Sequence, residues 1–419
     1  MKAPKLWIYN YDFEFELAGI QRIVFHGKHL APWYFLNRSG VVLIPFADEQ
    51  DSILIQELPD ERVLTGLESL LGYRPKLIPL KTGLNESNSL LYDFLKNRSL
   101  VSEYESHQPV PWGWSLSINN YQETIGFIKP PRFTVDTVKL INSKHYSAQV
   151  RKNLLPKTFD IPSLTITDAG TTKDEIKTVL AGFQQLHSQF FIKNFYGTSG
   201  KLSDFCSSET FSIKKIEKYR RWIQKNEGVL FEKFISKKKE ISVQVDIQPD
   251  ETIIPVAVTE LFSAKNGSYI GNILTDPIDT VLNELHSQLL PVLKNIAEKG
   301  YHGPLGIDLI ETENGEYKLL EINARLTMGR VAFEWHRKIN CHKTGLFANL
   351  FFKEQHISFP ESLDETAKQL EKNFDCRISI LNSVHSKINR SMLVTIFIAA
   401  NTKNILLEVV QKIKPALFQ

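Results

Sequence analysis

Apolar and polar positions follow two different periods along the first 130 residues. Short apolar runs at 5–9, 41–45 and 76–80 predict β-strands. Residues 61–72 instead place apolar side chains at helical spacing and predict a helix that ends at Gly72. Strands that alternate with helices are typical of an α/β unit. Because Pro130-Pro131 breaks regular structure, we expect an N-terminal α/β domain over residues 1–130.

The rest of the chain predicts three further parts. Residues 131–226 form the first, with helices at 134–155, 172–187 and 211–226 and strands at 161–166 and 190–193. Residues 227–350 form the second, with strands at 228–234, 240–247 and 252–261 and a helix at 280–299 that Pro291 should kink or divide. Residues 351–419 form a small α/β appendage, with helices at 363–372 and from 403 and strands at 377–381 and 392–398.

Asn314-Gly315 separates two strand-like runs and is a strong hairpin signal. If the turn is centred between these two residues, Asp308 lies directly opposite Glu321, and Asn323 follows on the same face. The other face then carries apolar side chains only and belongs to the core: Ile307, Leu309, Leu320 and Ile322.

Opposed like charges destabilise a strand pair, so a cation is expected between Asp308 and Glu321. Carboxylate and amide oxygens suit Mg²⁺, which completes its shell with water and substrate phosphates. The competing interpretation is a surface hairpin with solvated acids. The combination with Asn323 and Arg325 favours the metal site.

Composition limits the class of protein. The 419 residues are 42% hydrophobic and 23% charged, which is ordinary for a globular protein of several structural units. Fifty basic and 47 acidic residues give a net charge of +3, which indicates no nucleic-acid partner. The three cysteines, Cys206, Cys341 and Cys376, form no C-x-x-C pair. Neither a signal peptide nor a membrane span is evident, so we expect a cytoplasmic protein without a membrane partner.

Three further motifs occur in order before the hairpin. Asn142-Ser143-Lys144 precedes a helix and Asp160-Ile161-Pro162-Ser163. Phe191-Ile192-Lys193 ends an apolar strand and is followed by the small-residue loop Gly197-Thr198-Ser199-Gly200-Lys201. Gly228 to Ile235 reads G-V-L-F-E-K-F-I and is followed by Glu240. A lysine suits phosphate oxygens, and small residues let backbone N–H groups approach phosphates.

Together these motifs resemble the ATP-grasp superfamily over residues 137–335. The resemblance implies an ATP-grasp fold after an α/β pre-ATP-grasp domain, with ATP and two Mg²⁺ ions bound (Mn²⁺ being an alternative). Ser143 and Asp160 replace the usual Asp and Gly, and the segment 236–239 lacks a glycine often found there.

The resemblance also assigns roles to individual residues. Lys144 would contact the α-phosphate, Lys193 would be the second phosphate-binding and catalytic lysine, and Gly197, Ser199 and Gly200 would cover the phosphates within a lid at 193–204. Glu232 would accept from the adenine amino group, the backbone of Lys233 and Phe234 would pair with the ring edge, and Glu240 would hold the ribose. Asp308, Glu321 and Asn323 would bind Mg²⁺, and the catalytic Arg325 would face the transferred phosphate or the substrate carboxylate.

The implied reaction joins a small carboxylate to an amine (an amino acid or peptide) or a thiol through an acyl phosphate, releasing ADP and phosphate. The alternatives are a kinase acting on a hydroxyl, an ATP-dependent carboxylase and a non-catalytic ATP-binding protein. The intact lysine and metal-ligand positions argue against the last, and the lack of a biotin-attachment motif argues against a self-contained biotin-dependent carboxylase. A homodimer is left open.

Several other residues are candidates for substrate contacts. Lys265, Arg330 and Arg337 are candidates for holding carboxylates, and His302 and His336 for bases near the site. Trp112 and Trp114 are candidates for lining a pocket between domains. Each has a structural alternative, which is surface charge for the cations and packing for the aromatic residues.

Overall fold

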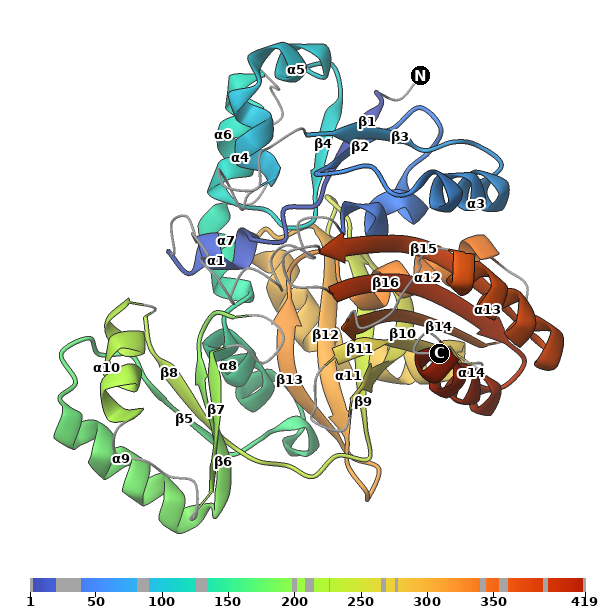
Figure 1. The fold of residues 1–419 in the computed structure, drawn as a ribbon. Coiled ribbons are helices and arrows are strands. Elements are labelled where there is room, and N and C mark those ends of the chain that lie inside the picture. Colours follow the sequence, from blue (N-terminus) through green and yellow to red (C-terminus); the bar gives the residue numbers. More distant parts are fainter. Residues whose placement is uncertain are drawn as a thin grey trace.

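We analysed a computed structural model of the 419-residue chain. The structure describes residues 3–19, 39–80, 90–125, 134–197, 202–207, 215–225, 227–264, 269–275, 278–339, 344–353, 361–386 and 391–416. The strands form three sheets, which belong to an N-terminal unit, a small lobe and a large lobe (Figure 1).

The N-terminal unit is a four-stranded parallel sheet in the order β3-β2-β1-β4. Its strands are β1 (Lys5–Ile8), β2 (Ser52–Ile55), β3 (Lys76–Pro79) and β4 (Gln108–Pro111). Its helices are α1 (Phe13–Leu17), α3 (Glu61–Leu71), α4 (Leu90–Lys96), α5 (Arg98–Glu103) and α6 (Leu116–Thr124). Helix α3 ends as predicted, because Gly72 adopts a left-handed φ of 79°.

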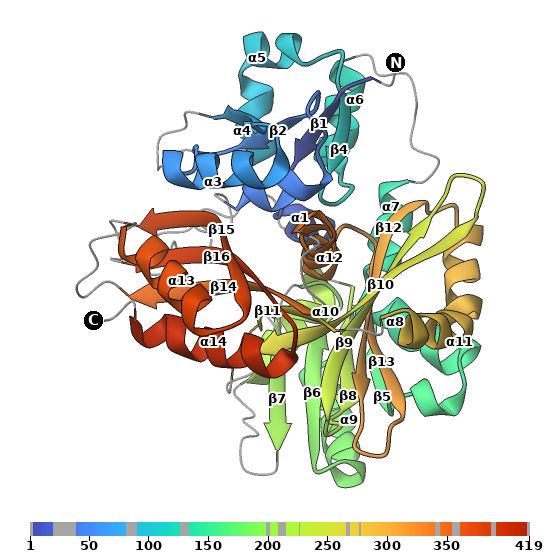
Figure 2. The same cartoon turned by 90° about the vertical axis from the view of Figure 1, so that its right-hand side faces the viewer.

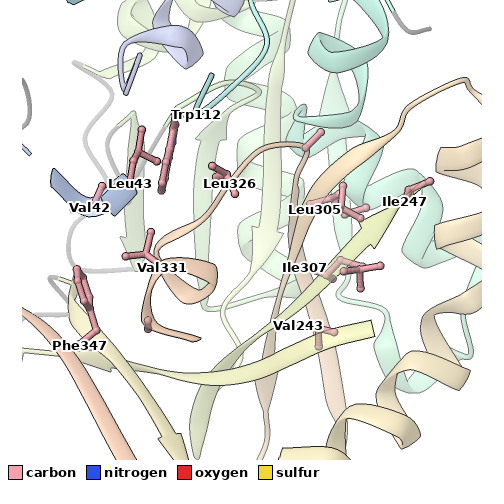
Figure 3. Close-up of a cluster of buried hydrophobic side chains, with 14 of the residues drawn as sticks. Val42, Leu43, Trp112, Val243, Ile247, Leu305, Ile307, Leu326, Val331 and Phe347 are labelled. Carbon is pink, nitrogen blue, oxygen red and sulfur yellow. The ribbon is translucent and has the colours of Figure 1, made fainter. Parts of the chain in front are cut away.

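The strand predicted at 41–45 is wrong. The segment is the 3₁₀ helix η2 (Gly40–Phe46), and its residues 40–45 are all buried. A short run that is apolar on every side does not distinguish a strand from a buried helical segment. Here the run packs between the N-terminal sheet and the large lobe, where Leu43 lies beside Trp112 (Figure 3).

The small lobe is a four-stranded antiparallel sheet in the order β5-β8-β6-β7. Its strands are β5 (Ser163–Ile166), β6 (Gln189–Asn194), β7 (Ser203–Ser207) and β8 (Val229–Lys233). Helices α9 (Lys173–Leu186) and α10 (Ile216–Lys225) cover one face, against Phe190, Ile192 and Phe231. Because side chains alternate, Lys193 and Glu232 point from the opposite face.

The single helix predicted at 134–155 is two helices, α7 (Val135–Ile141) and α8 (Lys144–Leu154), followed by the 3₁₀ turn η3 (Lys157–Phe159). The break falls at Ser143, whose backbone is extended and whose Oγ accepts a hydrogen bond from the Tyr146 N–H. A serine N-cap satisfies a donor that the first helical turn leaves free. The cap therefore starts a new helix, with Lys144 as its first residue.

The large lobe is an eight-stranded antiparallel sheet in the order β13-β12-β9-β10-β11-β14-β16-β15. Its strands are β9 (Lys239–Ile247), β10 (Ile253–Ser263), β11 (Tyr269–Thr275), β12 (Gly303–Glu311), β13 (Tyr317–Asn323), β14 (Thr344–Lys353), β15 (Cys376–Ser386) and β16 (Ser391–Ala400). Its helices are α11 (Ile278–Glu298), α12 (Met328–Ile339), α13 (Glu361–Asn373) and α14 (Lys403–Ala416). The sequence analysis missed β11, α12 and β14, and Pro291 does not divide α11.

The C-terminal segment continues this sheet, since β16 pairs with β14 along its whole length and β15 pairs with β16. Helices α13 and α14 cover one face of these strands (Figure 2). Among the described helices, none combines the length and the apolar character needed to cross a bilayer.

One hydrophobic core joins the N-terminal unit to the large lobe. Trp112 at the end of β4 is packed with Leu326 and Val331 of the segment that follows the hairpin (Figure 3). The Leu326 N–H donates to the Trp112 carbonyl at 3.0 Å, and Gly113 forms an isolated β-bridge with Arg325. This junction holds helix α1 next to the end of the hairpin.

Candidate active site

The hairpin of β12 and β13 pairs Asp308 with Glu321, as predicted. The pairing does not follow from a turn centred between Asn314 and Gly315, as the prediction assumed. The turn is centred on Asn314, with the Thr312 N–H bonded to the Glu316 carbonyl, and the pairs nearest the turn are offset by one residue. An irregularity in the ladder between Asp308 and Leu309 removes the offset.

The same irregularity changes which residues of β13 belong to the core face. Leu309 pairs with Leu319, so Leu320 is the extra residue of a β-bulge. Leu319 is fully buried and belongs to the core, whereas Leu320 is only half-buried. The assignment of Leu320 to the core was therefore wrong, because the bulge moves the β13 side chains on its turn-proximal side to the other face.

Hydrogen bonds fix the first carboxylate of the pair. Ser242 Oγ on β9 donates to Asp308 Oδ1 at 2.6 Å, and Asn323 Nδ2 donates to Oδ2 at 3.0 Å. Gln244 Nε2 in turn donates to Ser242 Oγ at 2.8 Å. Burial and then the charge of Glu321 raise the pKa of Asp308 to about 7, despite the Ser242 bond.

Lys144 binds the second carboxylate. Its Nζ lies 3.0 Å from Glu321 Oε2 and donates to the Gly197 carbonyl, also at 3.0 Å. Burial acts to raise the pKa of Glu321, but the charges of Lys144, Lys193 and Arg325 outweigh it and lower the pKa. Lys144 therefore links the small-residue loop to the metal-ligand strand, and the acids are bound by cations and donors rather than left in solvent.

The residues present fit a divalent cation. Burial is the main cause of the raised pKa of Asp308, and the charge of Glu321 adds to it; a cation between the two carboxylates would offset that second contribution. Asn323 lies two pairs along the same two strands, on the same face, and adds an amide oxygen. The described part of the chain contains no group of three His, Cys, Asp or Glu side chains that could hold a metal ion. The two carboxylates and the amide oxygen are ligands that suit Mg²⁺, which keeps further positions for water and phosphate oxygens.

Lys193 and Glu232 lie together, with a third residue that the sequence analysis missed. Lys193 Nζ pairs with Glu232, and Arg151 NH1 lies 2.6 Å from the other oxygen of the same carboxylate. Arg151 is fully buried and also donates to the carbonyls of Leu319 at 3.1 Å and Ile161 at 3.2 Å. It therefore connects the small lobe to the bulge of the hairpin.

A sequence signal for Arg151 existed. Lys144, Ser147 and Arg151 recur at helical spacing on one face of α8. Ser147 Oγ accepts from the Ile322 N–H at 3.1 Å, so all three polar side chains of this face reach the hairpin strand β13. Polar residues at helical spacing on one face of α8 were therefore the sequence signal for Arg151.

The backbone N–H groups at the hinge after β8 have partners within the small lobe, and the predicted adenine contacts of this hinge stay a prediction. The N–H groups of Lys233 and Phe234 donate to the carbonyls of Pro162 at 2.9 Å and Gln189 at 3.0 Å. They are therefore not available to a base edge in this conformation. The Phe234 ring is 37% exposed and lies 5.6 Å from Phe205, itself 40% exposed. The two rings meet edge to face and leave an exposed apolar patch on the face of the sheet that carries Lys193 and Glu232.

Glu240 lies on β9, two residues from Ser242, so both side chains point from the same face of the sheet as Asp308. Its carboxylate pairs with Lys237. The position is compatible with the predicted ribose contact, which stays a prediction.

Arg325 is held from three sides. Its Nε donates to Glu14 Oε1 at 2.7 Å, NH2 to Asn323 Oδ1 at 3.1 Å and NH1 to the Leu326 carbonyl at 3.0 Å. Its guanidinium lies 5.9 Å from the ring centres of Phe13 and Trp112. Glu14, from the N-terminal unit, was not anticipated.

These groups surround one pocket that encloses about 280 Å³, counting its solvent-open part. Its lining comes from all three sheet-bearing parts of the chain: Glu14, Leu17, Asn142, Lys144, Tyr196, Gly197, Glu321 and Asn323. Asn142 Oδ1 also accepts from the Ala324 N–H at 3.0 Å, which holds the first motif against the hairpin.

Other candidates have structural contacts. Arg330 makes a bidentate pair with Asp246 at 2.9 and 3.1 Å and bonds Glu334, which Arg337 also binds. Trp112 is buried in the core, and Trp114 Nε1 donates to Asn119 at 2.6 Å. His336 lies against the Phe397 ring, and His302 lies between α11 and β12. Ser199, Gly200, Lys201 and Lys265 fall outside the described residues.

We expect Lys193→Ala to weaken nucleotide binding or turnover more than Lys201→Ala does. Lys193 is 16% exposed and holds the buried Glu232 from the site-facing side of the sheet. Titration of a fluorescent ATP analogue against both variants, with turnover rates, measures the difference. Near-native affinity and rate for Lys193→Ala would remove this lysine from the site.

Comparison with known proteins agrees with this geometry. Residues 151–329 match the sequence model of a family described as an ATP-grasp domain. A butirosin acyl-carrier protein–L-glutamate ligase from Niallia circulans is 31% identical over 159 residues, which are 36% of this chain and 38% of that protein. The match thus spans less than half of either protein.

Solved structures extend the likeness of fold to nearly the whole chain. N5-carboxyaminoimidazole synthetase from Staphylococcus aureus, complexed with ADP, has a TM-score of 0.56 at 12% identity and covers 99% of this chain and 97% of its own. Biotin carboxylase from Campylobacter jejuni has a TM-score of 0.56 at 14% identity and covers 99% and 91%. At these identities the likeness establishes the fold alone.

The fold and the site define a protein of the nucleotide-binding α/β class. Residues 151–329 match the sequence model of an ATP-grasp domain, which is the family that the motifs predicted.

Proposed function

We propose that the protein is an ATP-dependent carboxylate–amine ligase that forms an amide bond through an acyl phosphate and releases ADP and phosphate. The observation that carries the proposal is a pocket lined by Lys144, Glu321 and Asn323. Asp308 lies opposite Glu321 on the hairpin, and Arg325 donates to Asn323 at 3.1 Å. The relative named as a ligase supports the reaction class.

The chain's own residues would act mainly by position and charge. Lys144 and Lys193 would bind phosphate oxygens, and Arg325 would face the transferred phosphoryl group. Asp308, Glu321 and Asn323 would hold two Mg²⁺ ions (or Mn²⁺), which neutralise charge on the ATP phosphates when bound. A substrate carboxylate oxygen would attack the γ-phosphorus, ADP would leave, and an amine would then displace phosphate from the acyl carbon.

The apolar surface of Phe205 and Phe234 supports adenine binding between the two lobes. The loop from Gly197 would cover the phosphates, because an acyl phosphate must be protected from water. Lys144 already contacts the first residue of this loop through the Gly197 carbonyl.

A second candidate acceptor is a group on a carrier protein. The relative's name pairs an acyl-carrier protein with L-glutamate. This would keep the acyl-phosphate step and change only the group that attacks the acyl carbon.

The proposal predicts hydroxamate formation. Hydroxylamine traps acyl phosphates, so ATP, Mg²⁺ and a pool of carboxylic acids that includes L-glutamate should give a hydroxamate, detected by mass spectrometry together with phosphate release. Omission of the acid should abolish the signal. A stable phosphorylated acceptor without hydroxamate would instead establish the kinase alternative.

Replacing hydroxylamine with amino acids or with a carrier protein then separates the two acceptors. An amide product supports the amine, and an acylated carrier supports the second candidate.

A further inference from the structure

Glu14 is an acidic side chain of the N-terminal unit that enters the pocket of the ATP-grasp domain. It lies on α1, is 10% exposed at its side chain and lines the pocket together with Lys144, Glu321 and Asn323. None of the roles assigned to nucleotide or metal binding uses it.

One oxygen of this carboxylate has a clear structural role. Glu14 Oε1 accepts from Arg325 Nε at 2.7 Å, a contact between residues 311 positions apart. The described part of the chain gives Oε2 no hydrogen-bond donor. A largely buried carboxylate whose second oxygen accepts no hydrogen bond from the described residues can bind a further cation beside β13.

The position of Glu14 suits a second substrate rather than a metal ion. The opposed Asp308 and Glu321 already form the predicted metal site, and Arg325 separates Glu14 from Asn323 at the edge of that site. The N-terminal unit contacts the end of the hairpin here, since Gly113 forms an isolated β-bridge with Arg325. The carboxylate is therefore held beside the place where the acyl phosphate is expected.

We propose that Glu14 binds the ammonium group of the acceptor amine and takes its proton as the amide bond forms. This inference rests on the proposed ligase function and names the acceptor class, a primary amine that arrives as a cation. The hydrogen bond between Arg325 and Glu14 orients both side chains, so that Glu14 keeps Arg325 aimed at the phosphoryl group.

The step balances as follows. The ammonium transfers one proton to the Glu14 carboxylate, and the freed nitrogen lone pair attacks the acyl carbon. The tetrahedral intermediate expels phosphate with the electron pair of the C–O bond, and the second proton of the nitrogen leaves with that phosphate. The products are an amide, inorganic phosphate and a protonated Glu14, which returns its proton to solvent.

The variant Glu14→Gln separates the binding and deprotonation of the ammonium from the hydrogen bond to Arg325. Glutamine still offers Oε1 to the guanidinium, but it neither binds an ammonium strongly nor takes its proton. Hydroxylamine is largely uncharged near neutral pH and needs no such carboxylate. With ATP, Mg²⁺ and the same acid pool, we expect amide formation with an amino-acid mixture to fall about a hundredfold or more. Hydroxamate formation should stay within a few-fold of wild type, and the KM for the amine should rise.

Glu16→Gln is the matched control on the same helix. Glu16 Oε1 accepts from the Ser117 N–H at 2.7 Å and from Ser117 Oγ at 3.0 Å, away from the pocket lining, so both products should be unchanged. Equal loss of amide and hydroxamate in Glu14→Gln would overturn the proposal and leave Glu14 as a positioning residue for Arg325. Hydroxamate without any amide from the wild type would also overturn it, whereas no wild-type hydroxamate would reject the ligase function itself.

Discussion

Glu321→Gln is expected to abolish ATP turnover while the fold stays intact. The wild-type carboxylate faces Asp308 across the hairpin and is bound by Lys144 at 3.0 Å. Glutamine has nearly the same shape and keeps an oxygen for Lys144, so packing is preserved. It removes the charge that a divalent cation requires, and phosphoryl transfer depends on that cation to neutralise the phosphates.

Circular dichroism and a phosphate-release assay test this prediction, and we expect turnover to fall by about a thousandfold or more, the scale of one lost electrostatic contact in a catalytic site. Glu316→Gln is the control, because Glu316 lies at the turn of the same hairpin and its carboxylate pairs with the neighbouring Lys318 at 3.1 Å. Wild-type turnover in Glu321→Gln would exclude this residue as a metal ligand. In the wild type, Mg²⁺ together with ATP should raise the melting temperature more than ATP alone does. In Glu321→Gln this difference should disappear.

Arg151→Met is expected to destabilise the protein by about 3–5 kcal/mol, the range for removing one partner of a buried ion pair. The substitution leaves Glu232, which is 2% exposed, with Lys193 as its remaining cation. It also removes the donors to the carbonyls of Leu319 and Ile161. Burial raises the pKa of Glu232, and Lys193 and Arg151 together lower it below its usual value, so the loss of either charge exposes the burial penalty.

Urea denaturation measures this loss of stability. Arg74→Met provides the contrast, because Arg74 is 46% exposed and binds the exposed Glu61, a kind of pair worth about 1 kcal/mol or less. Arg151→Lys should lie between the two, since it keeps a charge and loses the guanidinium fork. Equal midpoints for Arg151→Met and wild type would show that Arg151 does not hold the lobes together.

Arg151 should also affect nucleotide binding. It bonds the Leu319 carbonyl beside the bulge that sets the register of Asp308 and Glu321. We therefore expect weaker binding of Mg²⁺ and ATP by Arg151→Lys than by wild type under conditions where both proteins are folded.

The sequence by itself determined the local features of the protein. Alternation of strands and helices predicted the N-terminal unit, and Gly72 marked a helix end because only glycine adopts φ of 79° without strain. The hairpin sequence and its polar positions placed Asp308 opposite Glu321. These features depend on residues close together in the chain, where propensity and periodicity act directly.

The hairpin also shows how far such reasoning extends. The prediction centred the turn between Asn314 and Gly315, half a residue beyond its real centre at Asn314. The bulge at Leu320 cancels this offset at the Asp308–Glu321 pair. On the turn side of the bulge it exchanges the faces of the β13 side chains, so Leu319 and not Leu320 belongs to the core. Contacts from other elements accompany the bulge, including the bond from Arg151 to the Leu319 carbonyl. No local signal in the hairpin predicts a donor that lies 168 residues earlier.

Only the tertiary structure decided which residues surround the pocket. Glu14 meets Arg325 because the packing of Trp112, Leu43 and Leu326 holds the N-terminal unit against the hairpin. The segment 40–46 became a 3₁₀ helix because it is enclosed on every side, and residues 377–398 became part of the large sheet because β14 offered an edge. The physical reason is the same in each case, since burial and long-range pairing depend on partners that are distant in the sequence.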